Sequence, residues 1–397
     1  MIATTIAALP LVISVWLAVA RGGFWRGRED DAAMHAALPA RRAALGRWPD
    51  VVVVIPARDE AELVGVTVAS LLQQRYEGSL TAIVVDDHSD DGTTAVAIAA
   101  ATRVGGRERL TVLRAPTLLP DWTGKLSAVA HGVAHAEALP VPPEFLLLTD
   151  ADIRYGPDAV AALVSSAIDD RLILASLMVR LRCESVAERM LIPAFVFFFQ
   201  MLYPFAWVAE RRRRTAAAAG GCVLVKRTAL REAGGIAAIR GALIDDCALA
   251  KVLKPHGPIR LSLGEQVQSL RAYPAFDDIR RMVVRSAFAQ LRFSLWRLAF
   301  VVIAMLVVFV APVVAAVAGN GWTRVMGFGA WGLMALLFVP TIRRYRVPLW
   351  SAFALPGIAS AYLAFTVESA IQHVLGRGGM WKGRTNRACS ASTAEGP

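Results

Sequence analysis

The sequence has few cysteines and few charged residues. Its four cysteines, Cys183, Cys222, Cys247 and Cys389, show no paired spacing, so neither a zinc-binding motif nor a disulfide framework is indicated. Only 19% of its 397 residues are charged, whereas 56% are hydrophobic. A chain with so little charge is too apolar for a wholly soluble protein, and the composition therefore predicts membrane-spanning segments.

Glycine-rich phosphate-binding loops are also missing. No G-x-G-x-x-G follows the first expected strand, and "DWTGKLSAV" (residues 121–129) lacks the first glycine of a P-loop. His131 and His135 have the i, i+4 spacing of a metal-binding pair. Because the acid of a zincin motif is absent, a solvated helix face explains them better. Any bound nucleotide must be held by other groups.

Acidic residues are outnumbered by basic ones, 32 to 43, which gives a formal net charge of +11. Nucleic acid is one partner that such a charge would suit. Many of the basic residues, however, flank apolar runs, and anionic lipid headgroups explain basic clusters in that position more simply. We therefore expect a membrane and no nucleic acid among the partners.

Long uncharged runs lie near both ends of the chain. Residues 1–22 are expected to form a transmembrane anchor rather than a cleaved signal peptide, because basic residues follow the run instead of preceding it. Residues 298–375 are expected to form a transmembrane bundle from three runs, 298–323, 325–342 and 347–367. The basic loop 343–346 and the basic tail 376–397 both favour the cytoplasmic side. A single complete span between them would place them on opposite sides of the membrane, so the number of complete spans stays open.

The segment between these runs, residues 48–270, has the charges of a soluble α/β domain. Apolar and β-branched runs predict strands at 50–56, 80–85, 110–114 and 145–148, and helices are expected at 57–72 and 94–102. Alternating strands and helices predict a mostly parallel sheet, whose ligand crevice lies at the carboxyl ends of the strands.

Two of the expected strands end in acids. Asp86 and Asp87 follow the strand at 80–85, and Asp150 and Asp152 follow the buried run 145–148. Magnesium typically takes one or two carboxylates together with substrate phosphates, so an i, i+2 pair of acids suits a nucleoside diphosphate held through a divalent cation. Surface acids that only aid solubility are the alternative.

Six motifs in order make the middle of the chain recognisable. They are "VVVVIPARDE", "IVVDDHSDDGT", "TGKLSAVAHG", "LLLTDAD", "GGCVLVKRTAL" and "LIDDCALA". Over residues 50–265 the chain resembles family 2 glycosyltransferases, which are inverting enzymes of the GT-A fold. The whole chain, which ends with "GGMWKGR" and a short tail, is most similar to the hopanoid-biosynthesis-associated branch and, more distantly, to ceramide glucosyltransferases.

The resemblance implies roles for the acids at the strand ends. Asp86 and Asp87 match the acids that hold the uracil and ribose of a UDP-sugar, and Asp150 and Asp152 match the D-x-D that meets the diphosphate through Mg²⁺ or Mn²⁺. The implied substrate-binding set is Pro56, Ala57, Asp59, Glu60, Asp86, Asp87, Lys125, Asp150, Gly220, Gly221 and Arg292, and the implied metal ligands are Asp150 and Asp152.

The resemblance also implies a general base. Asp246 matches it, with Asp245 in place of the family's glutamate, so both are catalytic candidates. A carboxylate there would accept the proton of the acceptor hydroxyl, and Asp245 would raise its pKa by like-charge repulsion. Acids that complement the dipole of a helix N-terminus are the alternative explanation.

The chain departs from the pattern of processive members. Their Q-x-x-R-W is represented only by "QLRF", residues 290–293, which is one residue short and has phenylalanine for tryptophan. Polymer synthesis is therefore disfavoured, although Arg292 stays a candidate for diphosphate contact. Residues 271–297 are expected to form an amphipathic interfacial helix. Residues 190–214 are expected to form an interfacial segment, because a transmembrane span within 190–214 would put Asp150 and Asp246 on opposite sides of the membrane.

These observations predict a multi-pass protein of the cell (inner) membrane with a cytoplasmic GT-A domain. It would be an inverting glycosyltransferase that moves one sugar from a nucleotide-diphosphate donor, UDP in the first instance, to a membrane lipid. A hopanoid acceptor is implied only by the resemblance. The alternatives are a ceramide-type or polyprenyl-phosphate acceptor, a polysaccharide synthase, and a membrane scaffold with an inactive GT-A domain.

Overall fold

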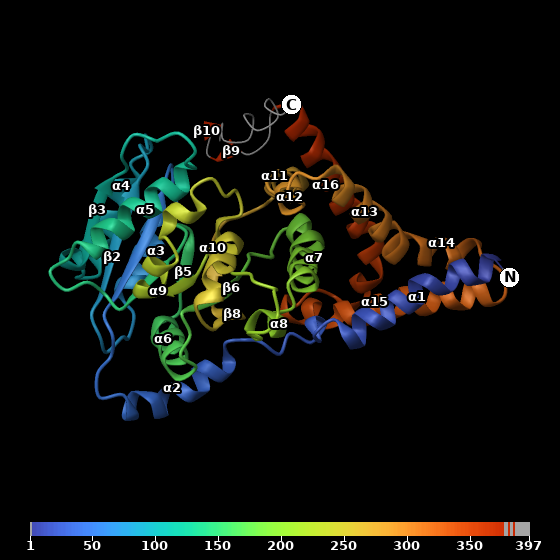
Figure 1. Ribbon diagram of the computed structural model, residues 1–397, viewed down its shortest axis with the longest axis horizontal. Coiled ribbons are helices and arrows are strands. Elements are labelled where there is room, and N and C mark those ends of the chain that lie inside the picture. Colours follow the sequence, from blue (N-terminus) through green and yellow to red (C-terminus); the bar gives the residue numbers. More distant parts are fainter. Residues whose placement is uncertain (1, 377–379, 382–383, 386–397) are drawn as a thin grey trace. The chain divides into compact units, whose positions relative to one another are not determined.

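The computed structural model describes residues 2–376, 380–381 and 384–385, and the chain divides into two compact units. The first unit contains Met1–Arg28, Arg182–Ala206 and Ala272–Gly379, and the second contains Glu29–Leu181, Trp207–Arg271 and the C-terminal residues. Most of the basic tail predicted at 376–397, with Cys389, lies outside the described residues. Figure 1 shows the order of the elements along the chain.

The second unit is built on an eight-stranded mixed sheet with the order β3-β2-β1-β4-β7-β6-β8-β5. Four neighbouring strands, β3, β2, β1 and β4, run parallel, whereas β7 is antiparallel to β4 and β6, and β5 is antiparallel to β8. The strands are β1 (Val51–Ala57), β2 (Leu80–Asp86), β3 (Leu110–Arg114), β4 (Phe145–Leu148), β5 (Ile153–Tyr155), β6 (Leu174–Arg180), β7 (Val223–Lys226) and β8 (Ile259–Ser269).

Helices cover both faces of this sheet. Alternate residues of β1 point to opposite faces, so Val53 packs in a core with Val68 of α3, while Val54 faces α5. The approach of α5 is close: a Cβ on Gly132 would lie 2.5 Å from the Val54 side chain. The helices of this unit are α2 (Ala32–Ala44), α3 (Val64–Leu72), α4 (Thr93–Arg103), α5 (Gly124–Glu137), α6 (Ala159–Asp169), α9 (Arg227–Glu232) and α10 (Asp245–Leu253).

The helix expected at 57–72 begins later, at Val64. Side chains from the loop after β2 and from the start of α4 bind the amides that would open an earlier helix: Ser89 accepts from the Asp59 amide and Thr93 from the Glu60 amide, each at 2.9 Å. Asp59 has φ 51°, which ends the strand sharply. Residues 58–63 therefore form turns between β1 and α3.

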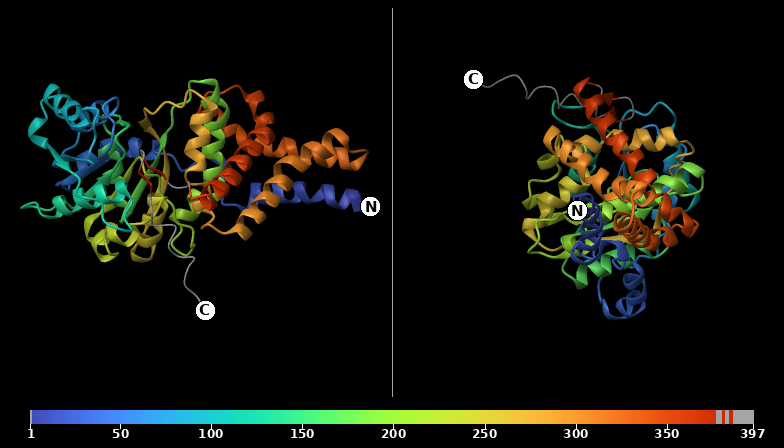
Figure 2. Two further views of the ribbon diagram at one scale, coloured as in Figure 1. Left: turned by 90° about the horizontal axis from the view of Figure 1, so that it is seen from above. Right: turned by 90° about the vertical axis from the view of Figure 1, so that its right-hand side faces the viewer.

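The first unit contains the long apolar helices. Three helices among the described residues are long and apolar enough to cross a membrane: Leu295–Ala318, Trp322–Arg344 and Leu349–Val374. They comprise α13 (Leu295–Met305), α14 (Ala311–Ala318), α15 (Trp322–Arg344) and α16 (Leu355–Val374), with a π-helical turn joining α13 to α14. The run at the start of the chain is helix α1 (Ile2–Ala20), and Figure 2 shows it alongside α14 and α15.

The segment predicted to be interfacial, 190–214, contains two helices. Helix α7 (Val186–Leu202) runs through Pro193 and begins with a capping box in which Ser185 accepts from the Glu188 amide. It belongs to the first unit, whereas residues Trp207–Arg271 belong to the second. The short helix α8 (Phe205–Ala209) contains the boundary between Ala206 and Trp207.

Residues 271–297 do not form the single helix that the sequence predicts. Two short helices, α11 (Phe276–Val284) and α12 (Ala287–Gln290), are separated by Arg285 and Ser286. Positive φ values at Arg292 and Phe293 then turn the chain before α13 begins. The amphipathic pattern is therefore divided among three helices.

Candidate active site

The sheet brings the predicted acids to one edge. The chain passes from β1 to β2 and β3 on one side, and β4 lies on the other side of β1, so the strand order reverses between β1 and β4. Ligands of open α/β sheets bind outside the carboxyl ends of the strands at such a reversal. Asp150 follows β4 by two residues, and Pro56 lies near the end of β1.

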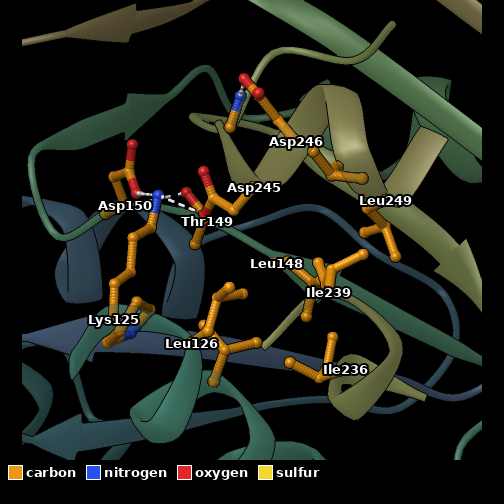
Figure 3. Close-up of a pocket in the computed structure, with 14 residues that line it drawn as sticks. Lys125, Leu126, Leu148, Thr149, Asp150, Ile236, Ile239, Asp245, Asp246 and Leu249 are labelled. Carbon is orange, nitrogen blue, oxygen red and sulfur yellow. Dashed lines mark hydrogen bonds and ion pairs between the residues drawn. The ribbon is translucent and has the colours of Figure 1, made fainter. Parts of the chain in front are cut away.

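A pocket at this edge has a charged side and an apolar side (Figure 3). Lys125, Asp150, Asp245 and Asp246 form the charged side together with Gly220. The other lining residues are Pro56, Leu126, Val129, Leu148, Thr149, Val223, Ile236, Ile239 and Leu249. The pocket therefore gathers side chains from β1, α5, the end of β4 and α10.

Lys125 joins two of the carboxylates. Its Nζ lies 2.8 Å from Asp150 Oδ1 and 3.0 Å from Asp245 Oδ2 (Figure 3). It is the second residue of α5, where the helix dipole disfavours a cation, so the two acids must offset that cost. Burial alone would lower the pKa of Lys125, but the attraction of Asp150 and Asp245 raises it. The residue is a fixed cation between acids that come from distant parts of the chain.

Asp246 is held by backbone amides. Its Oδ2 accepts from the Gly220 amide at 2.8 Å and its Oδ1 from the Cys247 amide at 2.6 Å. Burial and, after it, repulsion by Asp245 raise the pKa of Asp246 to about 6, although Lys125 and the two amides act in the opposite direction. A carboxylate with such a pKa is ionised near neutral pH yet basic enough to take a proton.

Asp150 and Asp152 have different surroundings. The Asp150 side chain is only partly exposed. Its partial loss of solvation raises the pKa of Asp150, and the attraction of Lys125 opposes that rise. Asp152 is buried, and its Oδ2 accepts from Ser269 Oγ and from Arg271 Nε, both at 3.1 Å. Both contacts of Asp152 are made by Oδ2, and the contact of Asp150 with Lys125 is made by Oδ1.

Arg271, which follows β8, is a residue that the sequence reasoning missed. Besides Asp152, its guanidinium donates to both oxygens of Glu60, at 2.7 and 2.8 Å. It thus ties the turn after β1 to the acid pair after β4. No local sequence pattern marks it, because its partners lie more than a hundred residues away along the chain.

Several predicted substrate-binding residues do not line this pocket: Ala57, Asp59, Glu60, Asp86, Asp87 and Gly221. Asp86 accepts from the Ser89 amide at 3.2 Å. Asp87 is buried, and its Oδ2 lies 3.5 Å from Arg58 Nη1. These acids sit at the end of β2, next to β1 in the sheet, so they extend the polar edge beyond the pocket.

The glycine pair has two distinct environments. A Cβ on Gly221 would lie 2.9 Å from the Val179 side chain, whereas a Cβ on Gly220 would meet nothing closer than 3.5 Å. The Gly221 carbonyl accepts from Thr149 Oγ1 at 2.8 Å, and the buried Tyr155 hydroxyl donates to that same Oγ1 at 2.8 Å. This network ties the chain just before Asp150 to the turn that holds Asp246.

Arg292 belongs to the first unit, whereas the residues that line the pocket all belong to the second. In the part of the chain that the structure describes, no group of three or more His, Cys, Asp or Glu side chains is placed to hold a metal ion. A cation held mainly by substrate phosphates needs only one or two carboxylates, and Asp150 and Asp152 supply that number.

The fold of the second unit has a counterpart among solved structures. Its mixed α/β sheet core, with mostly parallel strands, is GT-A-like. The solved mannosyltransferase PcManGT from Pyrobaculum calidifontis, in complex with GDP-Man and Mn²⁺, is similar to the chain at 18% identity, with a TM-score of 0.51 and 92% of this chain and 99% of that chain covered. This likeness is one of fold.

The family follows from the sequence match. Residues 49–264, more than half of the chain, match the model "Glycosyltransferase like family 2", and the chain belongs to this family. A weaker structural likeness is to mannosyl-3-phosphoglycerate synthase from Rubrobacter xylanophilus, at 18% identity, TM-score 0.40, and 68% and 83% of the two chains covered. No curated protein matches the chain.

Proposed function

We propose that the protein is an inverting glycosyltransferase that moves one sugar from a nucleotide-diphosphate donor to a membrane lipid. The observation that carries the proposal is the pocket in which Lys125 joins Asp150 to Asp245 and the Gly220 amide holds the neighbouring Asp246. The pocket thus contains a pair of catalytic candidates and an acid of the D-x-D pair. Membership of family 2 makes glycosyl transfer the chemistry to assign to it.

Asp246 is the proposed general base. The acceptor oxygen attacks the anomeric carbon, the bond from that carbon to the diphosphate oxygen breaks, and the hydroxyl proton passes to the Asp246 carboxylate. A base of pKa about 6 suits this task near neutral pH, and such catalysis typically contributes 10²–10⁴ in rate. One displacement on the face opposite the leaving group inverts the anomeric configuration.

The proposed donor lies along the carboxyl ends of β1, β2 and β4. Asp86 and Asp87 contact the nucleoside, UDP being the first candidate, and the turn at Asp59 and Glu60 lies beside them. Asp150 and Asp152 would hold Mg²⁺ or Mn²⁺ together with the donor phosphates, and the bound cation would neutralise charge on the leaving diphosphate. The Mn²⁺ and GDP-Man in the mannosyltransferase complex support a cation and a nucleotide sugar here.

The lipid acceptor is supported by the three helices that are long and apolar enough to cross a membrane. We propose a multi-pass protein of the cell membrane with the second unit in the cytoplasm, where nucleotide sugars are made. A hopanoid acceptor rests on the sequence resemblance alone. Ceramide-type and polyprenyl-phosphate lipids are the other acceptors to include in a test.

The test uses the full-length protein in nanodiscs with Mg²⁺ or Mn²⁺. A panel of UDP- and GDP-sugars is offered with hopanoid, ceramide and polyprenyl-phosphate acceptors, and released nucleoside diphosphate is measured by chromatography. We expect cation-dependent release that requires one lipid class, and a product whose anomeric coupling constant shows inversion. Absence of turnover with every pair would favour the inactive scaffold instead, and a product of many sugars would favour a polysaccharide synthase.

A further inference from the structure

Four consecutive arginines form an exposed loop in the second unit. Arg211, Arg212, Arg213 and Arg214 are all exposed and follow the exposed Glu210. Only Arg213 forms an ion pair, with Glu210 at 3.1 Å; the other three make none with any residue that the structure describes. We call residues 210–214 the arginine loop, and its three remaining charges face solvent.

A buried lysine braces the loop at its base. Lys254 is 9% exposed, and its Nζ donates to the carbonyl oxygens of Trp207 at 3.1 Å and Val208 at 2.9 Å, before the loop, and to that of Thr215 after it. Burying an ammonium group is costly unless each of its three donors is satisfied. Here all three bonds connect the two stems of one loop, so Lys254 fixes the conformation in which the arginines are presented.

An aromatic side chain supports the loop from the same stem. The Arg213 guanidinium lies 4.6 Å from the centroid of the Trp207 ring. Tryptophan is favoured at the level of membrane headgroups, where its apolar ring and polar N–H are both accommodated. The loop therefore combines cationic groups with the aromatic residue type that membrane interfaces select.

The arginine loop follows the first unit closely along the chain. Ala206 belongs to the unit that contains them, and Arg211 is five residues further along. Five residues span at most about 18 Å. Basic segments that lie close in sequence to helices able to cross a membrane are attracted by the negative charge of a bilayer surface.

We propose that the arginine loop is a docking surface for the headgroups of anionic phospholipids, with Lys254 as its positioning residue. Lys254 directly follows α10, whose first turn carries Asp245 and Asp246. Docking of the loop therefore restrains the far end of that helix, about 13 Å from the pocket acids at 1.5 Å per residue. The proposal concerns the bilayer surface and does not depend on the sugar or the acceptor.

The arginines themselves report on docking, because each is a trypsin site. Full-length protein is placed in nanodiscs of zwitterionic phosphatidylcholine, or of phosphatidylcholine with 30% phosphatidylglycerol, and cleavage within 211–214 is followed by mass spectrometry. The exposed Arg103, at the end of α4, is the reference site on the same unit. At low salt each arginine near an anionic surface contributes about fivefold in affinity, so we expect loop cleavage to slow at least tenfold relative to Arg103. The protection should disappear at 0.5 M salt.

Two variants and one soluble ligand complete the test. The double variant Arg211→Gln/Arg212→Gln keeps two trypsin sites. Protection of these sites from trypsin in anionic nanodiscs should be about 25-fold weaker than in the native protein, or absent. Lys254→Met keeps all four arginines but should lose most of the protection; if it does not fold, the native protein and the double variant still decide. Equal cleavage in both nanodiscs would overturn the proposal. So would equal protection by 10 mM inorganic phosphate in zwitterionic nanodiscs, which would indicate a site for free phosphate.

Discussion

The charges around Asp246 provide the sharpest prediction. Lys125→Met removes a cation that favours the ionised form of Asp246, whereas Asp245→Asn removes an anion that disfavours it. The first change should raise the pKa of Asp246 and the second should lower it. The two variants are therefore matched probes with opposite expected signs.

The size of the effect follows from the geometry. Lys125 Nζ and Asp246 Oδ2 each lie 3.5 Å from the position of a Cβ on Gly220, so they are no more than about 7 Å apart. At an effective dielectric constant of about 20, unit charges at that separation interact by about 2 kcal/mol. That energy corresponds to between one and two pKa units. We expect Lys125→Met to move the pKa of Asp246 from about 6 to about 7 or above.

The assay is the pH dependence of kcat/KM, measured by direct chromatography of released nucleoside diphosphate so that no coupling enzyme limits the pH range. With Asp246 as base, the rate of the native protein should fall tenfold per pH unit below about 6. The acid limb should move up in Lys125→Met and down in Asp245→Asn, whatever the loss in maximal rate. Limbs that coincide in all three proteins, or that move in the same direction, would refute this reasoning.

Three further predictions concern stability and can be tested by thermal unfolding of the detergent-solubilised protein. Gly221→Ala should lower the free energy of unfolding by about 1–3 kcal/mol, because its Cβ would lie 2.9 Å from the Val179 side chain. Gly220→Ala, whose Cβ would meet nothing closer than 3.5 Å, should leave the unfolding temperature within about one degree of the native value. Equal effects of the two changes would contradict the geometry. Arg271→Met should lower the free energy of unfolding by about 2 kcal/mol, a figure reduced because the side chain is partly exposed. Arg271→Lys should not restore this stability, because one ammonium group cannot replace a guanidinium that contacts two carboxylates. Full rescue by lysine would contradict the bridging role of Arg271. The pKa of Asp246 is higher in the folded protein than its ordinary value of 3.8, so the folded state binds the proton of Asp246 more tightly than the unfolded state does. The free energy of unfolding should therefore fall by up to about 3 kcal/mol as pH rises from 4 to 7. Asp246→Asn should lack this fall, and a pH profile identical to that of the native protein would contradict the raised pKa.

Much of the sheet was predictable because its strands are strongly patterned. The run 145–148 coincides with β4 and 110–114 with β3, and the predicted strand 80–85 is one residue shorter than β2. Buried parallel strands show continuous apolar runs, which local sequence reveals directly. The α/β class and the mostly parallel core are confirmed by the fold.

Features that depend on contacts between distant residues were not predictable. The start of α3 is set by Ser89 and Thr93, about thirty residues further along the chain. The guanidinium between Glu60 and Asp152 comes from Arg271, more than a hundred residues away from either acid. Neither contact leaves a periodic signal, because a hydrogen bond across the fold depends on tertiary packing rather than on spacing.

The pocket was predictable only in part. Asp150, Asp245, Asp246, Lys125 and Gly220 were expected together, and they line one pocket. Their individual roles remain predictions. The bridging position of the lysine between two acids depends on the placement of α5 against β4 and α10, which the motifs do not report.

The most direct test of the central claim separates donor binding from turnover in Asp246→Asn. Binding of the accepted nucleotide sugar with its divalent cation is measured by calorimetry, and turnover by release of nucleoside diphosphate. The account predicts a dissociation constant within about threefold of the native protein and turnover lower by at least a hundredfold. Turnover within tenfold of the native rate, with donor binding intact, would show that Asp246 is not the base.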